Sequence, residues 1–68
     1  MERVARVSEI IGASPVSFEE AIRVGFERAS RTLRGITGMR VMEQCVNGKN
    51  DRTVEYRVRI EVIFVLET

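Results

Sequence analysis

Few residues in this chain could do chemistry. It contains no histidine, so its one cysteine, Cys45, has no imidazole that could activate it as a nucleophile. The same composition argues against a structural zinc site, which needs cysteine and histidine ligands. Ser17 is better explained as a helix cap than as a nucleophile. We therefore expect a protein that is not an enzyme.

The carboxylates are candidates for holding a hard cation such as calcium. Calcium takes about six to eight oxygen ligands. The chain has ten acidic residues, but they form no dense acidic loop. The candidate metal ligands are therefore weak ones, and we expect them to act particularly where a symmetry axis brings several copies together: Glu43, Glu55 and Glu61.

The basic residues do not suggest a nucleic-acid partner. Eleven basic residues nearly balance the ten acidic ones, and the net charge is +1. Arg57 and Arg59, with Arg40 near them, would form a short basic strip, but Glu55 and Glu61 interrupt it and no aromatic residue is interleaved on that face. We expect neither nucleic acid nor an anionic membrane as a partner.

The element that must position these charges is a long strand over residues 53–66. Apolar and polar residues alternate along it, and one parity contains Val54, Tyr56, Val58, Ile60, Val62, Phe64 and Leu66. Fourteen residues extend about 46 Å, whereas a compact monomer of this length is about 28 Å across. The strand therefore predicts either a hard bend or contact with a neighbouring subunit. The mixed polar face suits a subunit interface or the wall of an internal cavity.

The other elements predict an α+β fold of β-α-β-β order, with a three-stranded antiparallel sheet wrapped on one amphipathic helix. The first strand is expected over residues 3–11, a turn over 12–15 and the second strand over 39–46. A loop looser than a two-residue turn is expected over residues 47–51. Ser17 and Glu20 fit a capping box at the start of the helix, and Gly35 is placed to end it. The apolar stripe of the helix is Ala21, Ile22, Gly25, Phe26, Ala29 and Leu33, and Glu19–Arg23 and Glu27–Arg31 are spaced to pair on its other face.

The size of the chain predicts a single domain, residues 1–68, that needs further support. A core of this size is marginal without disulfides, a metal or oligomerisation. One cysteine cannot form a disulfide within the chain, so oligomerisation is the remaining support. A single free thiol, no targeting segment and no apolar run long enough to span a membrane predict a cytoplasmic protein.

The order of these elements and several short motifs resemble the dodecin family. The resemblance spans nearly the whole chain and includes the Ile11-Gly12-x-Ser14 turn and the Ser17-x-Glu19-Glu20-Ala21-Ile22 helix start. Further matching segments are Ala29-x-x-Thr32-Leu33-Arg34, Arg40-Val41-x-Glu43 and Tyr56-Arg57-Val58-x-Ile60-Glu61-Val62-x-Phe64-x-Leu66. The resemblance implies a hollow homododecamer that stores or sequesters a small ligand without catalysis. Most dodecins bind flavin (riboflavin or FMN) in pairs, stacked between tryptophans, with a glutamine on the last strand hydrogen-bonded to the ring.

This chain departs from that pattern at both decisive positions. Gly38 stands where the resemblance places the tryptophan, and Arg57 stands where it places the glutamine. The implied flavin-pocket positions are thus Gly38, Arg57 and Glu43, in a degenerate form. Arg57 could stack on a ring or bind carbonyl or phosphate oxygens. Alternatively it pairs with Glu55, with Glu43 or with an acid of a neighbouring subunit.

The resemblance is closest to a branch of the family that lacks the tryptophan and binds calcium. It implies a non-catalytic homododecameric ligand-binding or storage protein whose usual flavin pocket is altered. The alternatives are a protein that still stores and sequesters flavin, and a calcium-binding dodecin. Its partners would be copies of itself and a small-molecule or metal-ion ligand.

Overall fold

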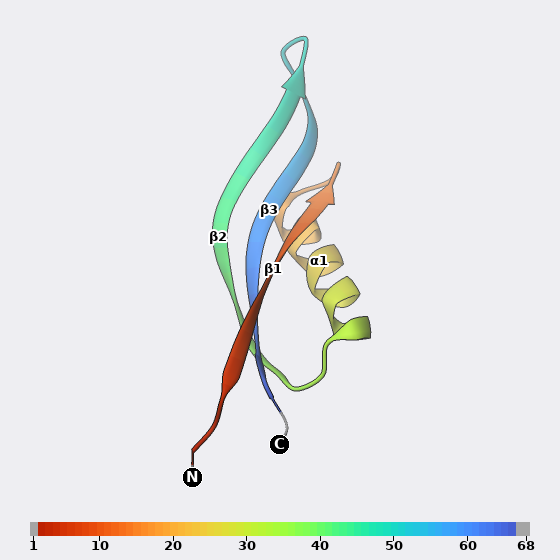
Figure 1. Cartoon of the computed structure of the whole chain (residues 1–68). Helices are drawn as coiled ribbons and strands as arrows, with labels where there is room; N and C mark the ends of the chain where they lie inside the picture. Colours follow the sequence, from red (N-terminus) through yellow and green to blue (C-terminus); the bar gives the residue numbers. More distant parts are fainter. Residues whose placement is uncertain (1, 67–68) are drawn as a thin grey trace.

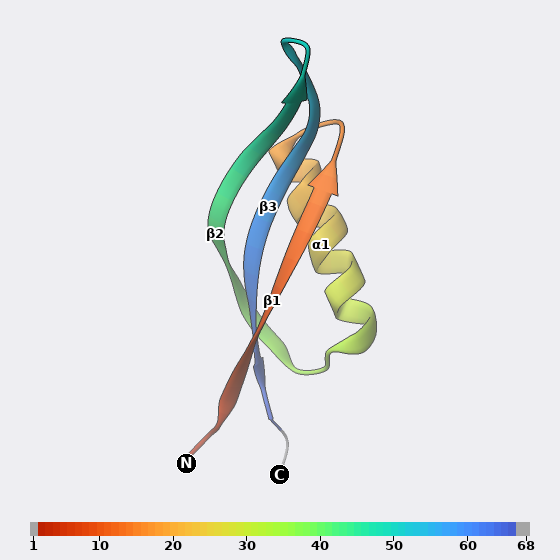
Figure 2. The ribbon, with the colours of Figure 1, turned by 45° about the horizontal axis from the view of Figure 1, so that its top comes forward.

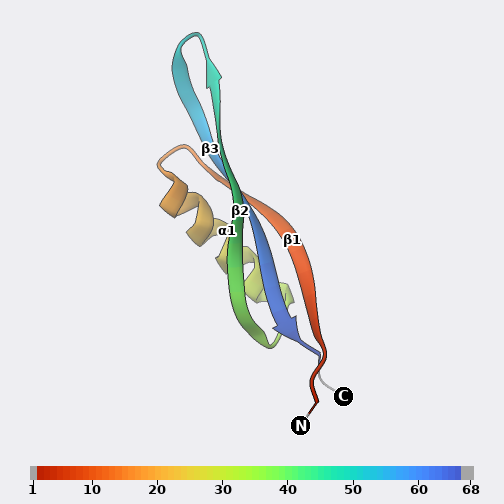
Figure 3. The same ribbon diagram turned by 90° about the vertical axis from the view of Figure 1, so that its left-hand side faces the viewer.

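The computed structural model describes residues 2–66, and it confirms the β-α-β-β order (Figure 1). The elements are β1 (Ala5–Ser14), α1 (Phe18–Thr32), β2 (Ile36–Lys49) and β3 (Arg52–Val65). The sheet is antiparallel throughout, and its order β1-β3-β2 places the last strand in the centre. The helix packs against β1 and β3 on one side of the sheet, and the other side of the sheet is open (Figure 3).

The core lies between the helix and the middle of β3. Val58, Ile60 and Val62 are completely buried, and they pack with Ala21 and Ala29 of the helix. The predicted apolar parity of β3 is therefore confirmed where α1 covers it. The ends of that series are not covered, and Val54 remains 54% exposed. Gly25 is also buried. The buried positions of the helix are thus all small residues, which lets the helix approach the sheet closely.

The buried centre of β3 should dominate the stability of the fold. We expect Ile60→Ala to lower the free energy of unfolding by about 2–5 kcal/mol, because it removes a completely buried side chain and leaves a cavity. Ile11→Ala is the matched control, because Ile11 is 61% exposed on the open face. Urea unfolding followed by circular dichroism measures both changes. Equal losses in the two variants would contradict this location of the core.

The molecule is elongated, with extents of 54 × 19 × 13 Å and a radius of gyration of 14.2 Å. The β2–β3 hairpin projects beyond both the helix and β1 (Figures 1 and 2). The last pair between β1 and β3 is Ser14 with Tyr56, so the part of β3 before Tyr56 has β2 as its only neighbouring strand in the described chain. The long strand is thus accommodated by an extended shape, and the compact monomer assumed from chain length is wrong for the isolated chain.

The first strand is longer than predicted at its C-terminal end. Residues 12–14 pair with β3 and do not form the expected turn; the chain bends at Pro15 and Val16. Gly12 is required for packing, because a Cβ there would lie 2.1 Å from the carbonyl oxygen of Ala21. The strand ends where the buried Ser14 hydroxyl accepts a hydrogen bond of 3.0 Å from the Val16 N–H. A glycine that looked like a turn residue therefore marks a close approach of strand and helix.

The second strand and its turn also differ from the prediction. β2 extends past both expected ends, and Lys49 pairs directly with Arg52. The connection is a two-residue turn in which Asn50 and Asp51 have φ values of 53° and 63°. Asn and Asp tolerate this left-handed conformation, which matches the twist of a tight hairpin. The predicted loop over 47–51 is wrong, because Asn47 and Gly48 lie inside the strand at a shift of register.

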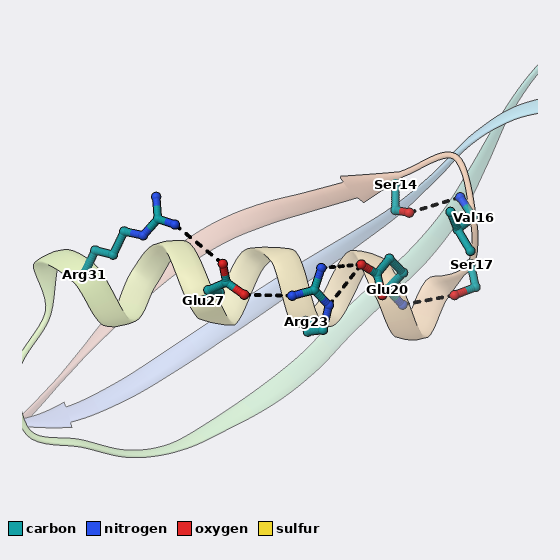
Figure 4. Close-up of polar contacts among 7 residues, drawn as sticks. All are labelled: Ser14, Val16, Ser17, Glu20, Arg23, Glu27 and Arg31. Carbon is teal, nitrogen blue, oxygen red and sulfur yellow. Dashed lines mark hydrogen bonds and ion pairs between the residues drawn. The ribbon is translucent and has the colours of Figure 1, made fainter.

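The start of the helix is capped as predicted, but only by half of the capping box (Figure 4). The Ser17 hydroxyl accepts a hydrogen bond of 3.0 Å from the Glu20 N–H. The Glu20 carboxylate does not reach back to the cap; it accepts hydrogen bonds from Arg23, which lower the pKa of Glu20. Arg23 also donates to Glu27 at 2.7 Å, so it pairs with these two acids and not with the predicted Glu19.

The end of the helix comes earlier than predicted. α1 ends at Thr32, and the cap residue Leu33 has extended backbone. Gly35, with φ of 72°, turns the chain into β2 after the helix has ended. The predicted Glu27–Arg31 pair is present at 3.5 Å. In the part of the chain that the structure describes, no helix is long and apolar enough to cross a membrane.

Candidate functional site

The open face of the sheet carries most of the charged residues of interest, arranged in rows across β1, β3 and β2. One row contains Glu9, Glu61 and Arg40, the next Ile11, Arg59 and Glu43, and the third Ala13, Arg57 and Cys45. A shift of register between Val41 and Glu43 creates this arrangement. Without that bulge, Arg40 and Glu43 would face opposite sides of the sheet.

A small hollow lies on this open face. Its volume is about 140 Å³, and it is lined by Ile11, Glu43, Cys45, Arg57 and Arg59. All three strands contribute, with the two arginines on the central strand. The hollow thus combines two guanidinium groups, a carboxylate and a thiol with one apolar wall. It contains hydrogen-bond donors and acceptors but no aromatic ring.

Both arginines of the hollow contact acids that lie outside it. The Nε atom of Arg57 lies 2.5 Å from Oε1 of Glu55, and that of Arg59 lies 3.7 Å from Oε1 of Glu9. Glu55 also accepts a hydrogen bond of 3.4 Å from Asn47. The expected pairing of Arg57 with Glu55 is therefore observed. Exposed pairs of this kind contribute about 0–1 kcal/mol, so a ligand can compete for the arginines.

The structure brings together two of the three predicted flavin-pocket residues. Glu43 and Arg57 line the same hollow, but Gly38 pairs with Ile63, six positions from Arg57 along β3. That separation is about 20 Å. A Cβ added to Gly38 would meet no atom within 4 Å. Gly38 therefore lies beside open space, away from the hollow. Within one chain, Gly38 and Arg57 cannot line the same pocket.

The three candidate metal ligands do not converge within one chain. Glu43, Glu55 and Glu61 lie in different rows of the open face, and the latter two contact Arg57 and Arg40. Over residues 2–66, no three acidic, cysteine or histidine side chains are grouped so that they could hold a metal ion. A site made from these residues would need several copies of the chain.

Sequence reasoning missed Ile11 and Cys45 as neighbours of the predicted site. Ile11 comes from β1 and Cys45 from β2, and the register that aligns Cys45 with Arg57 includes a bulge. The alternation of β3 did show that Arg57 and Arg59 share a face. No sequence signal identified which residues of β1 and β2 lie beside them.

Comparisons with known proteins agree with this fold. The family model Dodecin matches residues 4–67. Calcium dodecin of Mycobacterium tuberculosis is 36% identical over 61 residues, which cover 90% of this chain and 86% of the relative. The dodecin of Streptomyces davaonensis has a similar structure, with a TM-score of 0.93, 31% identity and 100% of each chain covered. The crystal structure of the calcium dodecin of M. tuberculosis, with a calcium-binding site, has a TM-score of 0.83 at 34% identity and covers 94% and 91% of the two chains. Because the family match and the structural matches extend over nearly the whole β-α-β-β unit, this chain belongs to the dodecin family.

Proposed function

We propose that this dodecin is a non-catalytic homododecameric protein that binds or stores a small ligand, and that its flavin pocket is altered. The observation that carries the proposal is the pair of changed positions. Gly38 has open space but no ring, and Arg57 lies in a polar hollow together with Glu43. The exposed thiol of Cys45 favours a reducing compartment, and a cytoplasmic location is part of the proposal.

Assembly is supported by surfaces that one chain leaves uncovered. The helix packs on β1 and β3, so the helix-side face of β2 has no cover of its own, and Met39, Val41 and Val46 are exposed there. Gly38 and Arg57 are too far apart to contact one small ligand within a chain. They could act on the same ligand only where two copies meet. A marginal core of this size also needs such support.

The altered pocket predicts weak flavin binding. Base–aromatic stacking contributes about 1–3 kcal/mol per ring, and Gly38 supplies no ring. Arg57 can still donate to a carbonyl or phosphate oxygen once it leaves Glu55. The ligand of this protein is therefore one that depends more on polar contacts than on stacking.

Calcium is the second candidate ligand, and one relative favours it. The curated relative at 36% identity is a calcium dodecin. Within residues 2–66, the carboxylate of Glu43 forms no ion pair, and an anionic oxygen of this kind suits calcium. Several copies of Glu43, with Glu55 or Glu61, would be needed to complete the coordination shell.

Native mass spectrometry and visible absorption of the purified protein test the proposal together. We expect a colourless twelve-subunit assembly that binds added flavin only weakly. Extra mass with a yellow colour would support the flavin-storage alternative, and extra mass that a chelator removes would support calcium. Monomers or dimers alone would contradict the proposed assembly and the composite pocket with it.

A further inference from the structure

We propose that the hollow on the open face binds an oxyanion, the carboxylate or phosphate group of a small ligand, through Arg57 and Arg59. The inference rests on the proposed function, because it names the ligand chemistry of the altered pocket. It starts from the lining of the hollow, in which two guanidinium groups stand beside Glu43, Cys45 and Ile11.

The terminal amino groups of Arg57 and Arg59 remain available to a ligand. Arg57 and Arg59 each approach an acid through Nε, at 2.5 Å and 3.7 Å. Over residues 2–66, no hydrogen bond or ion pair joins a terminal Nη atom of either arginine to another residue. These amino groups form the part of a guanidinium that binds carboxylate or phosphate in a two-pronged way.

The spacing of the arginines suits one anion between them. They alternate on the same strand and face, so their backbones are about 6.6 Å apart, and each long side chain can reach the space between. The hollow is small, about 140 Å³, which favours a compact group over a ring system. Glu55 and Glu9 lie outside it and act as positioning residues that hold the two Nε atoms.

The carboxylate of Glu43 should oppose anion binding in the hollow. It lines the same hollow, so it repels a bound anion while the arginines attract it. Substitutions at the three positions should therefore change anion affinity in opposite directions. A role of these residues in stability alone would not produce that pattern.

The experiment is a thermal melting titration of the purified protein with sodium phosphate or sodium acetate, each matched in ionic strength with sodium chloride. A ligand that binds the folded state raises Tm as its concentration increases. We expect an increase beyond the chloride control, weakened about tenfold or more in Arg59→Gln, because hydrogen bonds to charged groups are lost. Glu43→Gln should tighten binding. Arg31→Gln is the matched control, because Arg31 lies on the helix and pairs with Glu27.

The two anions distinguish the source of the oxyanion. A response to phosphate alone indicates a phosphorylated ligand, and an equal response to acetate indicates a carboxylate. No response beyond chloride, or the same response in Arg59→Gln and Arg31→Gln, would overturn the inference. Native mass spectra of the same samples separate the two proposals: a dodecamer without anion response rejects the anion site alone, whereas a monomer rejects the assembly. The hollow belongs to a single chain, so the titration decides the anion site in either case.

Discussion

Gly12→Ala is expected to lower the free energy of unfolding by about 3 kcal/mol or more. The added Cβ would lie 2.1 Å from the carbonyl oxygen of Ala21 and 3.1 Å from its carbonyl carbon. Both are backbone atoms, so β1 and the helix would have to separate. Overpacking typically costs about 1–3 kcal/mol, and a clash with backbone should reach or exceed the upper value. Urea unfolding followed by circular dichroism measures the loss.

Gly38→Ala is the matched control for this prediction. A Cβ at Gly38 meets nothing within 4 Å, so the same chemical change is made without a clash. Alanine also restricts the unfolded chain, which can stabilise a protein by about 0.4–1 kcal/mol. We expect Gly38→Ala to unfold at the same or a higher urea concentration than the unmodified chain. If Gly12→Ala matched it, the close packing of strand on helix would be refuted.

The double substitution Gly38→Trp with Arg57→Gln is expected to restore strong flavin binding. The tryptophan supplies the missing stacking surface in the open space at Gly38, and the glutamine can both donate to and accept from the ring edge. Two stacks of about 1–3 kcal/mol each, one for each flavin of a pair, correspond to a combined gain in affinity of about 30-fold to 10⁴-fold. Quenching of flavin fluorescence on titration with the protein measures it.

The single variants Gly38→Trp and Arg57→Gln separate the contributions of stacking and of hydrogen bonding to flavin affinity. Gly38→Trp alone should recover most of the affinity, because stacking supplies most of the energy. Arg57→Gln alone should change flavin affinity little. Native mass spectrometry must show that each variant has the same assembly as the unmodified protein. A fully assembled double variant that still fails to bind flavin would reject the assignment of Gly38 and Arg57 to the pocket.

The regular parts of the fold could be predicted because local patterns determine them. The alternation in β3 identified Val58, Ile60 and Val62 as core residues, and Ser17 identified the start of the helix. The wrong predictions concern residue types that are common in turns but also occur for other structural reasons. Gly12 was interpreted as a turn residue, although the backbone of the helix is what requires it. Similarly, Asn47–Gly48 resembles a hairpin turn but lies within β2, because the turn itself is made by Asn50 and Asp51, which adopt the left-handed conformation.

The candidate site was predicted less completely than the fold. Arg57 and Glu43 were predicted for one pocket, and they line one hollow. Their neighbours Ile11 and Cys45 depend on how β1 and β2 pair with β3, and a bulge shifts the register of β2 by one residue. The separation of Gly38 from Arg57 also depends on that register. Site geometry in a sheet is set by pairing between distant segments, and a single sequence contains little information about it.

The strand order has a consequence for the way the chain folds during its synthesis. β1 is made first, but its partner β3 is made last, and Ala5 pairs with Val65 near the other end of the chain. The core side chains Val58, Ile60 and Val62 are supplied by that same final strand. Until β3 is available, β1 has no partner and the apolar side of the helix has nothing to pack against. We therefore expect folding, and any association with other copies, to wait until β3 has emerged from the ribosome.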